Sequence, residues 1–220
     1  MKFVYIVFLS ILFNYSVFAN DVEKKFISAG LIDIKTMDKT IKVDLVNSDK
    51  KKNYFNENFY NGLKKAYLQK EVAKKLSKAQ KILKKQHPKL SLYILDAARP
   101  RSVSILMYKK MKGTLFEKYV AKPKNGSMHN YGIAVDLTIV DENGKLLDMG
   151  ISPFYKTKLQ IYHAYAKKKL GQKLTKKQKQ NRALLKRVMK TAGFYPLSFE
   201  WWHFNGLKRK VARRKYKPIK

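Results

Sequence analysis

The chain has 220 residues, of which 49 are Lys or Arg and 15 are Asp or Glu, giving a formal net charge of +34 at pH 7. It contains no cysteine, which excludes a disulfide framework, a thiol nucleophile and a lipid-modified cysteine. A charge of this size favours polyanionic partners, although a lysine-rich surface that only keeps the protein soluble explains it equally well.

Residues 1–19 predict a secretory signal peptide that is cleaved after Ala19. Lys2 precedes a short apolar run, and Ala19 provides the small residue that such cleavage sites require. A transmembrane anchor is the alternative, but the run is short and is broken by Asn14 and Ser16. Export without cysteine indicates a bacterial envelope protein, which we expect in the periplasm. There, anionic lipid or cell-wall polymer replaces nucleic acid as the expected partner of the charge.

Residues 20–220 are long enough for a single domain with its own hydrophobic core. Short apolar or alternating stretches predict strands at residues 31–34, 42–46 and 90–95. Apolar residues at helical spacing predict helices at residues 70–86, 102–111, 155–170 and 176–192. The expected fold class is α+β, with a small, mostly antiparallel sheet that carries the functional site and helices packed around it.

Capping and turn residues mark the ends of several of these elements. Ser102 is a candidate cap for the helix that follows it, and Thr175 with Gln178 forms a capping box for the last helix. Gly193 is expected to end that helix. Residues 141–144 (DENG) predict a hairpin turn.

Two short segments contain the candidate catalytic residues. The first is residues 127–136 (SMHNYGIAVD), and the second is residues 200–203 (EWWH). A catalytic zinc site needs three N or O ligands, an open position for water and a nearby base that does not bind the metal. His129, Asp136 and His203 can be the ligands, which leaves Glu200 as the base. His129 and Asp136 are seven residues apart, so one unbroken strand would point them to opposite faces. Gly132 lies between them and can turn the backbone.

Aromatic residues surround the second segment, and we expect them to wall the site and lower its dielectric constant. They are Phe199, Trp201, Trp202 and Phe204. Each ionisable residue, considered singly, is more often a packed core histidine or a turn aspartate. It is their combination that favours a metal site.

The pattern Ser-x-His-x-x-Gly-x-x-x-Asp, followed much later by Glu-x-x-His, resembles the zinc D-alanyl-D-alanine dipeptidases. These belong to the wider group of D-Ala-D-Ala metallopeptidases, which includes D,D-carboxypeptidases. The likeness runs from about residue 54 to residue 206. It implies that residues 20–220 form a peptidase domain that binds one zinc ion. The implied substrate is D-Ala-D-Ala or a peptidoglycan stem peptide.

The same resemblance implies roles for further residues. The strand at 90–95 leads into Asp-Ala-Ala-Arg-Pro, and the dipeptidases carry Asp-x-x-Arg-Pro, whose Arg contacts the substrate and the developing oxyanion. Arg99 matches that Arg, and a planar, permanently charged donor suits the role. Alternatively, Arg99 only pairs with Asp96 as part of the turn. Ser127 is expected to hydrogen-bond the substrate. Residues 53–62 (NYFNENFYNG) are similar to the family's Asn-Phe loop and predict an ordered loop near the site.

One departure from the family concerns the substrate's amino group. The dipeptidases continue after the metal-binding Asp with Met-Gly-x-x-Phe-Asp, whose Asp receives the free ammonium group. Here residues 149–154 read MGISPF, and Tyr155 falls at the position of that Asp. A phenol is uncharged at neutral pH, so Tyr155 can bind the substrate by accepting a hydrogen bond but cannot pair with a cation. Either Asp148 or Glu142 substitutes for it, or the requirement for a free N-terminus is relaxed.

The predicted function is therefore hydrolysis of D-Ala-D-Ala in peptidoglycan metabolism. A D,D-carboxypeptidase acting on longer stems is the nearest alternative, and a zinc-bearing wall-binding protein without turnover is the second. Glu200 argues against the second alternative, because binding alone needs no base. The tail at residues 207–220 carries eight basic residues in fourteen, and we expect a solvated, frayed end. Attraction of this tail to an anionic envelope surface is its alternative role.

Overall fold

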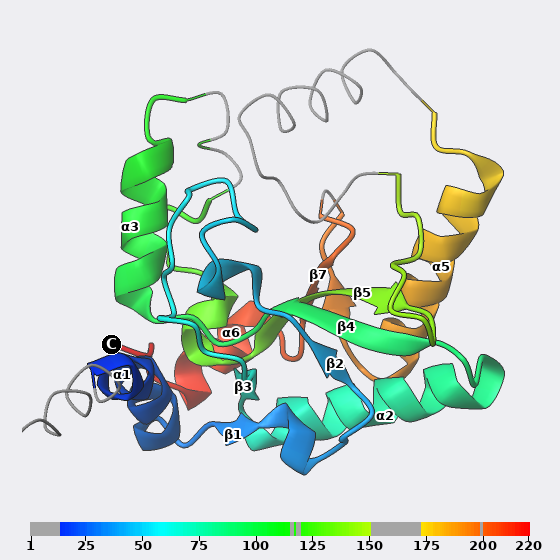
Figure 1. Ribbon diagram of the computed structural model, residues 1–220, viewed down its shortest axis with the longest axis horizontal. Coiled ribbons are helices and arrows are strands. Elements are labelled where there is room, and N and C mark those ends of the chain that lie inside the picture. The colour runs from blue at the N-terminus through cyan, green and yellow to red at the C-terminus, as the bar shows by residue number, and fades with distance from the viewer. Residues whose placement is uncertain (1–13, 115–116, 118–119, 151–172, 199) are drawn as a thin grey trace, which may run out of the picture.

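The computed structural model describes residues 14–114, 117, 120–150, 173–198 and 200–220 (Figure 1). Within these ranges, no helix is both long and apolar enough to cross a membrane. The helix predicted at 155–170 lies outside the described residues.

The fold is built on a five-stranded sheet with the strand order β2-β4-β5-β7-β6. Only β2 and β4 pair in parallel, and the other neighbours are antiparallel. A separate two-stranded sheet pairs β1 with β3. The predicted α+β class with a mostly antiparallel sheet is therefore confirmed. The strands are β1 Ile32–Asp33, β2 Lys42–Val43, β3 Tyr67–Leu68, β4 Ser91–Asp96, β5 Ala134–Val140, β6 Tyr195–Pro196 and β7 His203–Asn205.

Helices lie around this sheet (Figure 1). The α-helices are α1 Asn14–Ser28, α2 Lys70–Gln86, α3 Arg101–Met111, α5 Lys176–Thr191 and α6 Arg209–Lys215. Short 3-10 helices are η1 Ile34–Thr36, η2 Val46–Ser48 and η4 Met128–Tyr131. The helix predicted at 70–86 has the bounds of α2, and the capping box of Thr175 and Gln178 opens α5 as predicted.

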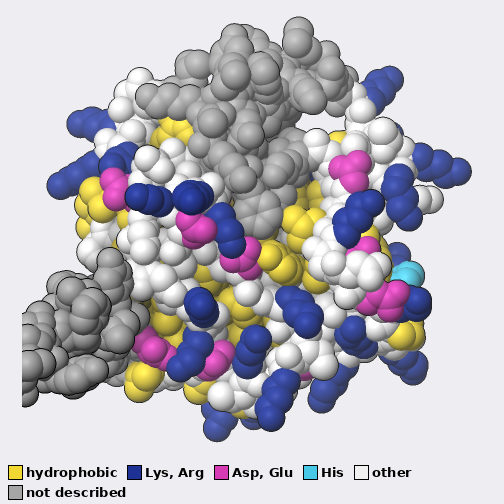
Figure 2. Space-filling model, in the orientation of Figure 1, with side chains coloured by type: hydrophobic (Ala, Val, Ile, Leu, Met, Phe, Trp, Pro, Cys, Tyr) yellow, Lys and Arg dark blue, Asp and Glu magenta, His cyan; other side chains and the backbone are white. Residues whose placement is uncertain are grey.

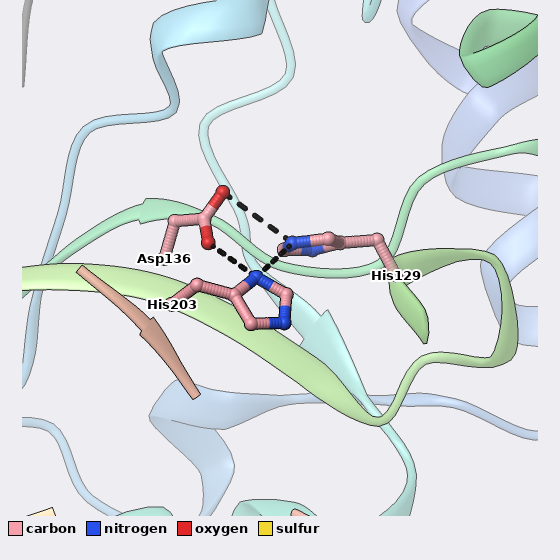
Figure 3. Close-up of side chains that lie close together, drawn as sticks. All are labelled: His129, Asp136 and His203. Atoms are coloured by element: carbon pink, nitrogen blue, oxygen red, sulfur yellow. Dashed lines mark hydrogen bonds and ion pairs between the residues drawn. The ribbon is translucent and has the colours of Figure 1, made fainter. Parts of the chain in front are cut away.

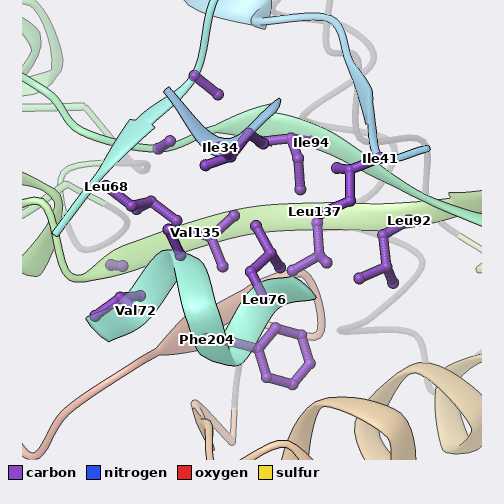
Figure 4. Close-up of a cluster of buried hydrophobic side chains, with 14 of the residues drawn as sticks. Ile34, Ile41, Leu68, Val72, Leu76, Leu92, Ile94, Val135, Leu137 and Phe204 are labelled. Atoms are coloured by element: carbon purple, nitrogen blue, oxygen red, sulfur yellow. The ribbon is translucent and has the colours of Figure 1, made fainter. Parts of the chain in front are cut away.

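The hydrophobic core lies between the sheet and α2. Val72 and Leu76 of α2 pack toward Val135 and Leu137 of β5 and Phe204 of β7, and all five side chains are at most 1% exposed (Figure 4). Side chains alternate along a strand, so the residues between these apolar positions face the other side of the sheet. That opposite face is where the polar residues of β5 and β7 gather.

Several local predictions need correction. The third helix begins at Arg101 with Pro100 at its cap, so Ser102 is not the capping residue. Proline suits this position because it has no N–H and its φ is already fixed. The strand predicted at 31–34 is shorter, because Ile34 begins η1. The predicted hairpin at 141–144 is present, with Asp141 and Lys145 joined by a backbone hydrogen bond of 3.0 Å.

The prediction of a frayed tail is wrong. Residues 209–215 form α6, and Ala212 and Ile219 are 0% and 3% exposed. Lys215 reaches Glu71 of α2 at 2.7 Å, and the Tyr216 hydroxyl donates to the same carboxylate. The tail is therefore a packed element with a charged outer surface. On the face shown in Figure 2, Lys and Arg side chains are spread over the described surface without forming one large patch.

Candidate active site

The site is assembled on the polar face of the sheet by strand register. Asp136 of β5 pairs directly with His203 of β7, so their side chains point to the same side. Their neighbours Val135 and Phe204 are buried in the core on the other side. Asp96, at the end of β4, pairs with Asp136 from the opposite edge. The register thus places three polar side chains in a row across the sheet.

His129 comes from η4, which precedes β5. Ser127 caps η4 by accepting a hydrogen bond from the His129 N–H at 3.3 Å, and the Asn130 side chain completes a capping box. Gly132 then turns the chain with a φ of 64°. A Cβ on this glycine would lie 2.5 Å from the Leu31 side chain, so both conformation and space require glycine here. The turn allows His129 to face Asp136 despite their odd spacing.

The three predicted ligands converge on one point (Figure 3). The Nε2 of His129 lies 3.2 Å from the Nδ1 of His203 and 3.3 Å from the Oδ2 of Asp136. The Nδ1 of His203 lies 2.9 Å from the Oδ1 of Asp136. One donor atom from each residue lies within 4.8 Å of the others, which makes the cluster a candidate metal-binding triad.

Hydrogen bonds on the outer side of each imidazole set which nitrogen faces the triad. The Nδ1–H of His129 donates to the carbonyl oxygen of Ala97 at 2.6 Å, which leaves its Nε2 lone pair inward. The Nε2–H of His203 donates to the Oδ1 of Asn205 at 3.0 Å, so its Nδ1 faces the triad. This is the usual outer support of metal-binding histidines. Two imidazoles and a carboxylate so arranged fit a zinc ion.

Sequence reasoning missed both of these supporting groups. Asn205 could have been found, because residues two apart on a strand share a face and Asn205 follows His203 by two. The Ala97 carbonyl could not, since any residue type supplies one.

The residues of the triad shift one another's pKa values. Burial alone would raise the pKa of Asp136, but His129 and His203 outweigh burial and hold that pKa well below its usual range. Burial likewise opposes protonation of His203, yet the hydrogen bond and charge of Asp136 raise the pKa of that imidazole. The carboxylate of Asp136 is therefore ionised and available as an anionic metal ligand.

Glu200 lies beside the triad but outside it. Its Oε2 is 3.8 Å from the Nδ1 of His203, and its side chain is 16% exposed. Burial raises the pKa of Glu200, and the charge of His203 partly opposes this shift. The side chain is thus close enough to act on a group at the triad and has a higher proton affinity than an ordinary glutamate.

Arg99 pairs with Asp96, which is one of the two alternatives that its sequence left open, and it also lines the pocket described below. Its Nε donates to the Oδ2 of Asp96 at 3.0 Å, and a terminal nitrogen pairs with the same oxygen. Asp96 also accepts from the Tyr60 hydroxyl at 2.8 Å and from Asn47 at 3.0 Å. Tyr60 belongs to the loop at 53–62, which is tied to the site in this way. Burial alone would lower the pKa of Arg99, but Asp96 raises it, so the guanidinium stays charged.

A pocket of about 220 Å³ opens onto these groups. Its described lining includes the triad, Glu200, Arg99, Ser127 and Trp202, together with small or apolar side chains such as Val120, Ala121 and Leu197. Phe204 was expected to wall the site, and this is wrong because it points to the core face of β7. Trp201 instead packs against Arg182, with 5.5 Å between the guanidinium carbon and the ring centre. Phe199 lies outside the described residues.

The residues considered for the substrate's amino group are not gathered here. Tyr155 lies outside the described residues. Asp148 accepts hydrogen bonds from the Gly150 N–H and from Gln178, and Glu142 pairs with Lys89 at 2.8 Å. Neither Asp148 nor Glu142 is among the described residues that line the pocket.

A His–Asp–His cluster with a half-buried carboxylate and a guanidinium in one small pocket is the arrangement of a metal-dependent hydrolase. The chain belongs to the D-Ala-D-Ala dipeptidase family, whose family model matches residues 28–219.

Two D-alanyl-D-alanine dipeptidases are similar to it. The protein from Escherichia coli (strain K12) is 35% identical over 115 residues, which are 52% of this chain and 54% of that protein. The chain thus matches about half the length of that relative. The protein from Synechocystis sp. is 26% identical over 176 residues, covering 66% of this chain and 71% of that protein. A solved LD-carboxypeptidase, LdcB, is 18% identical, with a TM-score of 0.39 over 67% of this chain and 63% of that one.

Proposed function

We propose that the protein is a zinc-dependent peptidase that hydrolyses D-alanyl-D-alanine in peptidoglycan metabolism. The observation that carries the proposal is the convergence of His129, Asp136 and His203 in a pocket that also contains Glu200 and Arg99. Membership in the D-Ala-D-Ala dipeptidase family supports the choice of substrate. The expected signal peptide, cleaved after Ala19, would deliver the enzyme to the periplasm, where such peptides occur.

One zinc ion would be held by the Nε2 of His129, the carboxylate of Asp136 and the Nδ1 of His203. When bound, zinc supplies a Lewis acid for the scissile carbonyl and lowers the pKa of a coordinated water. The outer hydrogen bonds to Ala97 and Asn205 keep both imidazoles in the orientation and tautomer that this binding requires.

Glu200 acts as the general base in this proposal. It takes a proton from the attacking water as the water oxygen bonds to the carbonyl carbon, and it gives that proton to the leaving amine as the C–N bond breaks. A raised pKa suits a group that must hold the proton between these two steps. Its place beside the triad, but outside the set of converging donors, supports the role of base over that of ligand.

Arg99 donates hydrogen bonds to the carbonyl oxygen as negative charge develops there. Its pairing with Asp96 holds the guanidinium at the pocket wall, where its side chain is 15% exposed. Ser127 also lines the pocket, and its hydroxyl is proposed to bind the substrate in addition to capping η4.

A D,D-carboxypeptidase acting on longer stem peptides is the second candidate. It is favoured by one observation: apart from Asp136 and Glu200, no acidic residue lines the described part of the pocket, so no carboxylate is left there for a substrate ammonium group. Weak discrimination against blocked or longer peptides is the result we expect from such a pocket.

Three substrates distinguish the candidate functions: D-Ala-D-Ala, its N-acetyl form and a pentapeptide stem that ends in D-Ala-D-Ala. Released D-alanine is measured by mass spectrometry after the purified protein is loaded with zinc. Rapid cleavage of the free dipeptide supports the proposal, and complete rejection of the N-acetyl form would point to a substitute carboxylate. Comparable or faster cleavage of the blocked and longer peptides would favour the carboxypeptidase. Zinc binding without cleavage of any of the three would favour the non-catalytic alternative.

A further inference from the structure

A second arginine, Arg209, lines the pocket, and the proposed reaction does not use it. It is the first residue of α6 and is exposed. Within the described ranges, its side chain forms neither an ion pair nor a hydrogen bond. Arg99 differs, because its charge is offset by Asp96. Arg209 is therefore a cation at the pocket wall without a described counter-charge.

The helix that carries Arg209 is held at several points, so the side chain is presented from a fixed backbone. Ala212 of α6 is fully buried. Arg213 donates to the carbonyl of Asn125 at 2.7 Å, and Lys215 pairs with Glu71 at the same distance. A loose basic tail would lose much side-chain and backbone entropy on holding a ligand, whereas an anchored one loses less.

The chemistry of the pocket indicates which group Arg209 would bind. The two carboxylates in its lining, Asp136 and Glu200, both lie at the imidazole cluster. An unpaired guanidinium can bind a carboxylate by donating two parallel hydrogen bonds to it. The pocket, at about 220 Å³, is below the roughly 300–1,000 Å³ typical of small-molecule sites, so it suits the end of a peptide better than a chain passing through.

We propose that Arg209 binds the terminal carboxylate of the peptide substrate and so makes the enzyme select free C-termini. This inference rests on the proposed peptidase function, but it holds equally for a dipeptide and for a longer stem, since both end in a carboxylate. Arg209 is thus a specificity-determining residue, supplied by the basic C-terminal segment.

The test compares D-Ala-D-Ala with its C-terminal amide, which has the same shape but no negative charge. Arg209→Gln removes the cation, and Arg214→Gln is the matched control, because Arg214 lies on the same helix, is exposed and does not line the pocket. For Arg209→Gln, kcat/KM for the free acid falls about 10- to 100-fold, mainly through KM, as expected when a charge-assisted hydrogen bond is lost. The same variant leaves kcat/KM for the amide unchanged, and Arg209→Lys restores part of the loss.

Two results would overturn the inference: equal losses for acid and amide in Arg209→Gln, or no loss for either. Loss of the same size in Arg214→Gln would assign the effect to net charge and would also overturn it.

A binding measurement keeps this inference separate from the proposed function. Calorimetric titration of acid and amide into Glu200→Ala, with and without Arg209→Gln, needs no turnover. A preference for the acid that disappears with Arg209→Gln supports the carboxylate contact even if the wild-type protein hydrolyses neither compound. Equal affinity for acid and amide, or no binding of either, refutes it.

Discussion

The backbone N–H of Ile219 donates a hydrogen bond of 2.7 Å to the carbonyl oxygen of Asn130, the residue that follows His129. The carbonyl of Ile219 in turn accepts from the Arg101 N–H at 2.8 Å. The tail thus joins the segment that carries His129 to the segment that carries Arg99. Two parts of the candidate site, some thirty residues apart in the sequence, are fixed relative to each other by a third.

Asn130 is the centre of this junction, so its replacement should disturb both stability and metal binding. Its Nδ2 donates to the carbonyl of Arg99 at 2.9 Å and to the Ser104 hydroxyl at 2.8 Å, and its Oδ1 accepts from the Ser127 N–H. Asn130→Ala leaves these buried groups without partners, which should cost about 1–3 kcal/mol in the free energy of unfolding. Urea unfolding and zinc competition measure the two effects. The exposed Asn143→Ala serves as control, and equal stability of both variants would contradict the prediction.

Asn205 should act on zinc affinity through His203. Asn205→Ala removes the acceptor of the His203 Nε2–H, so affinity should fall about 10- to 100-fold, as for other outer partners of metal-binding histidines. Asn205→Asp keeps an acceptor oxygen and should recover most of the affinity. Competition with a chromophoric chelator gives the dissociation constants. An unchanged zinc dissociation constant in Asn205→Ala would show that this hydrogen bond does not affect zinc affinity.

Glu200 should be dispensable for the metal and necessary for turnover. Glu200→Ala is expected to retain one zinc per chain and to lose roughly 10²- to 10⁴-fold in kcat, the usual contribution of a positioned acid–base group. Elemental analysis and steady-state kinetics on the same preparation check both parts. If the zinc leaves with the carboxylate, Glu200 is a ligand instead.

Arg99→Lys keeps a positive charge but loses the planar fork that pairs with Asp96. A lysine cannot hold the carboxylate at two nitrogens and still present donors to the substrate in a fixed direction. We therefore expect kcat to fall by more than KM rises. An unchanged kcat would return Arg99 to a purely structural role.

The link between the tail and α2 should be sensitive to acid. Hydrogen bonds from Lys215 and Tyr216 lower the pKa of Glu71 in the folded protein. Because the folded-state pKa is the lower one, this stabilisation is fully present above the unfolded value of about 4.3 and is lost as the pH falls through the folded one. Glu71→Gln should therefore flatten part of the acid limb of the stability profile below about pH 5. The effect is small, since the pair is partly exposed. Unfolding by urea across that range tests it, and superimposable pH profiles would contradict it.

What the sequence predicted well was governed by local rules. The bounds of α2, the capping box at Thr175 and the turn at Gly132 follow from residues within a few positions of one another. The tail was predicted wrongly for the opposite reason. Its basic residues carry no local sign that Ile219 would be buried or would bond to Asn130. The same holds for the support of Arg99, since nothing near it in the sequence indicates Asn47 or Tyr60.

The chain of contacts from Tyr60 and Asn47 through Asp96 to Arg99 has a consequence for how substrate is held. An arginine side chain that moves freely carries about 2 kcal/mol of rotamer entropy, which it loses when it is ordered. Here the ordering takes place as the polypeptide folds, because buried Asp96 immobilises the guanidinium before any peptide arrives. In the proposed reaction, substrate binding to Arg99 is therefore spared that entropic penalty. Loosening the aromatic loop around Tyr60 should therefore weaken substrate binding indirectly, through Asp96 and Arg99.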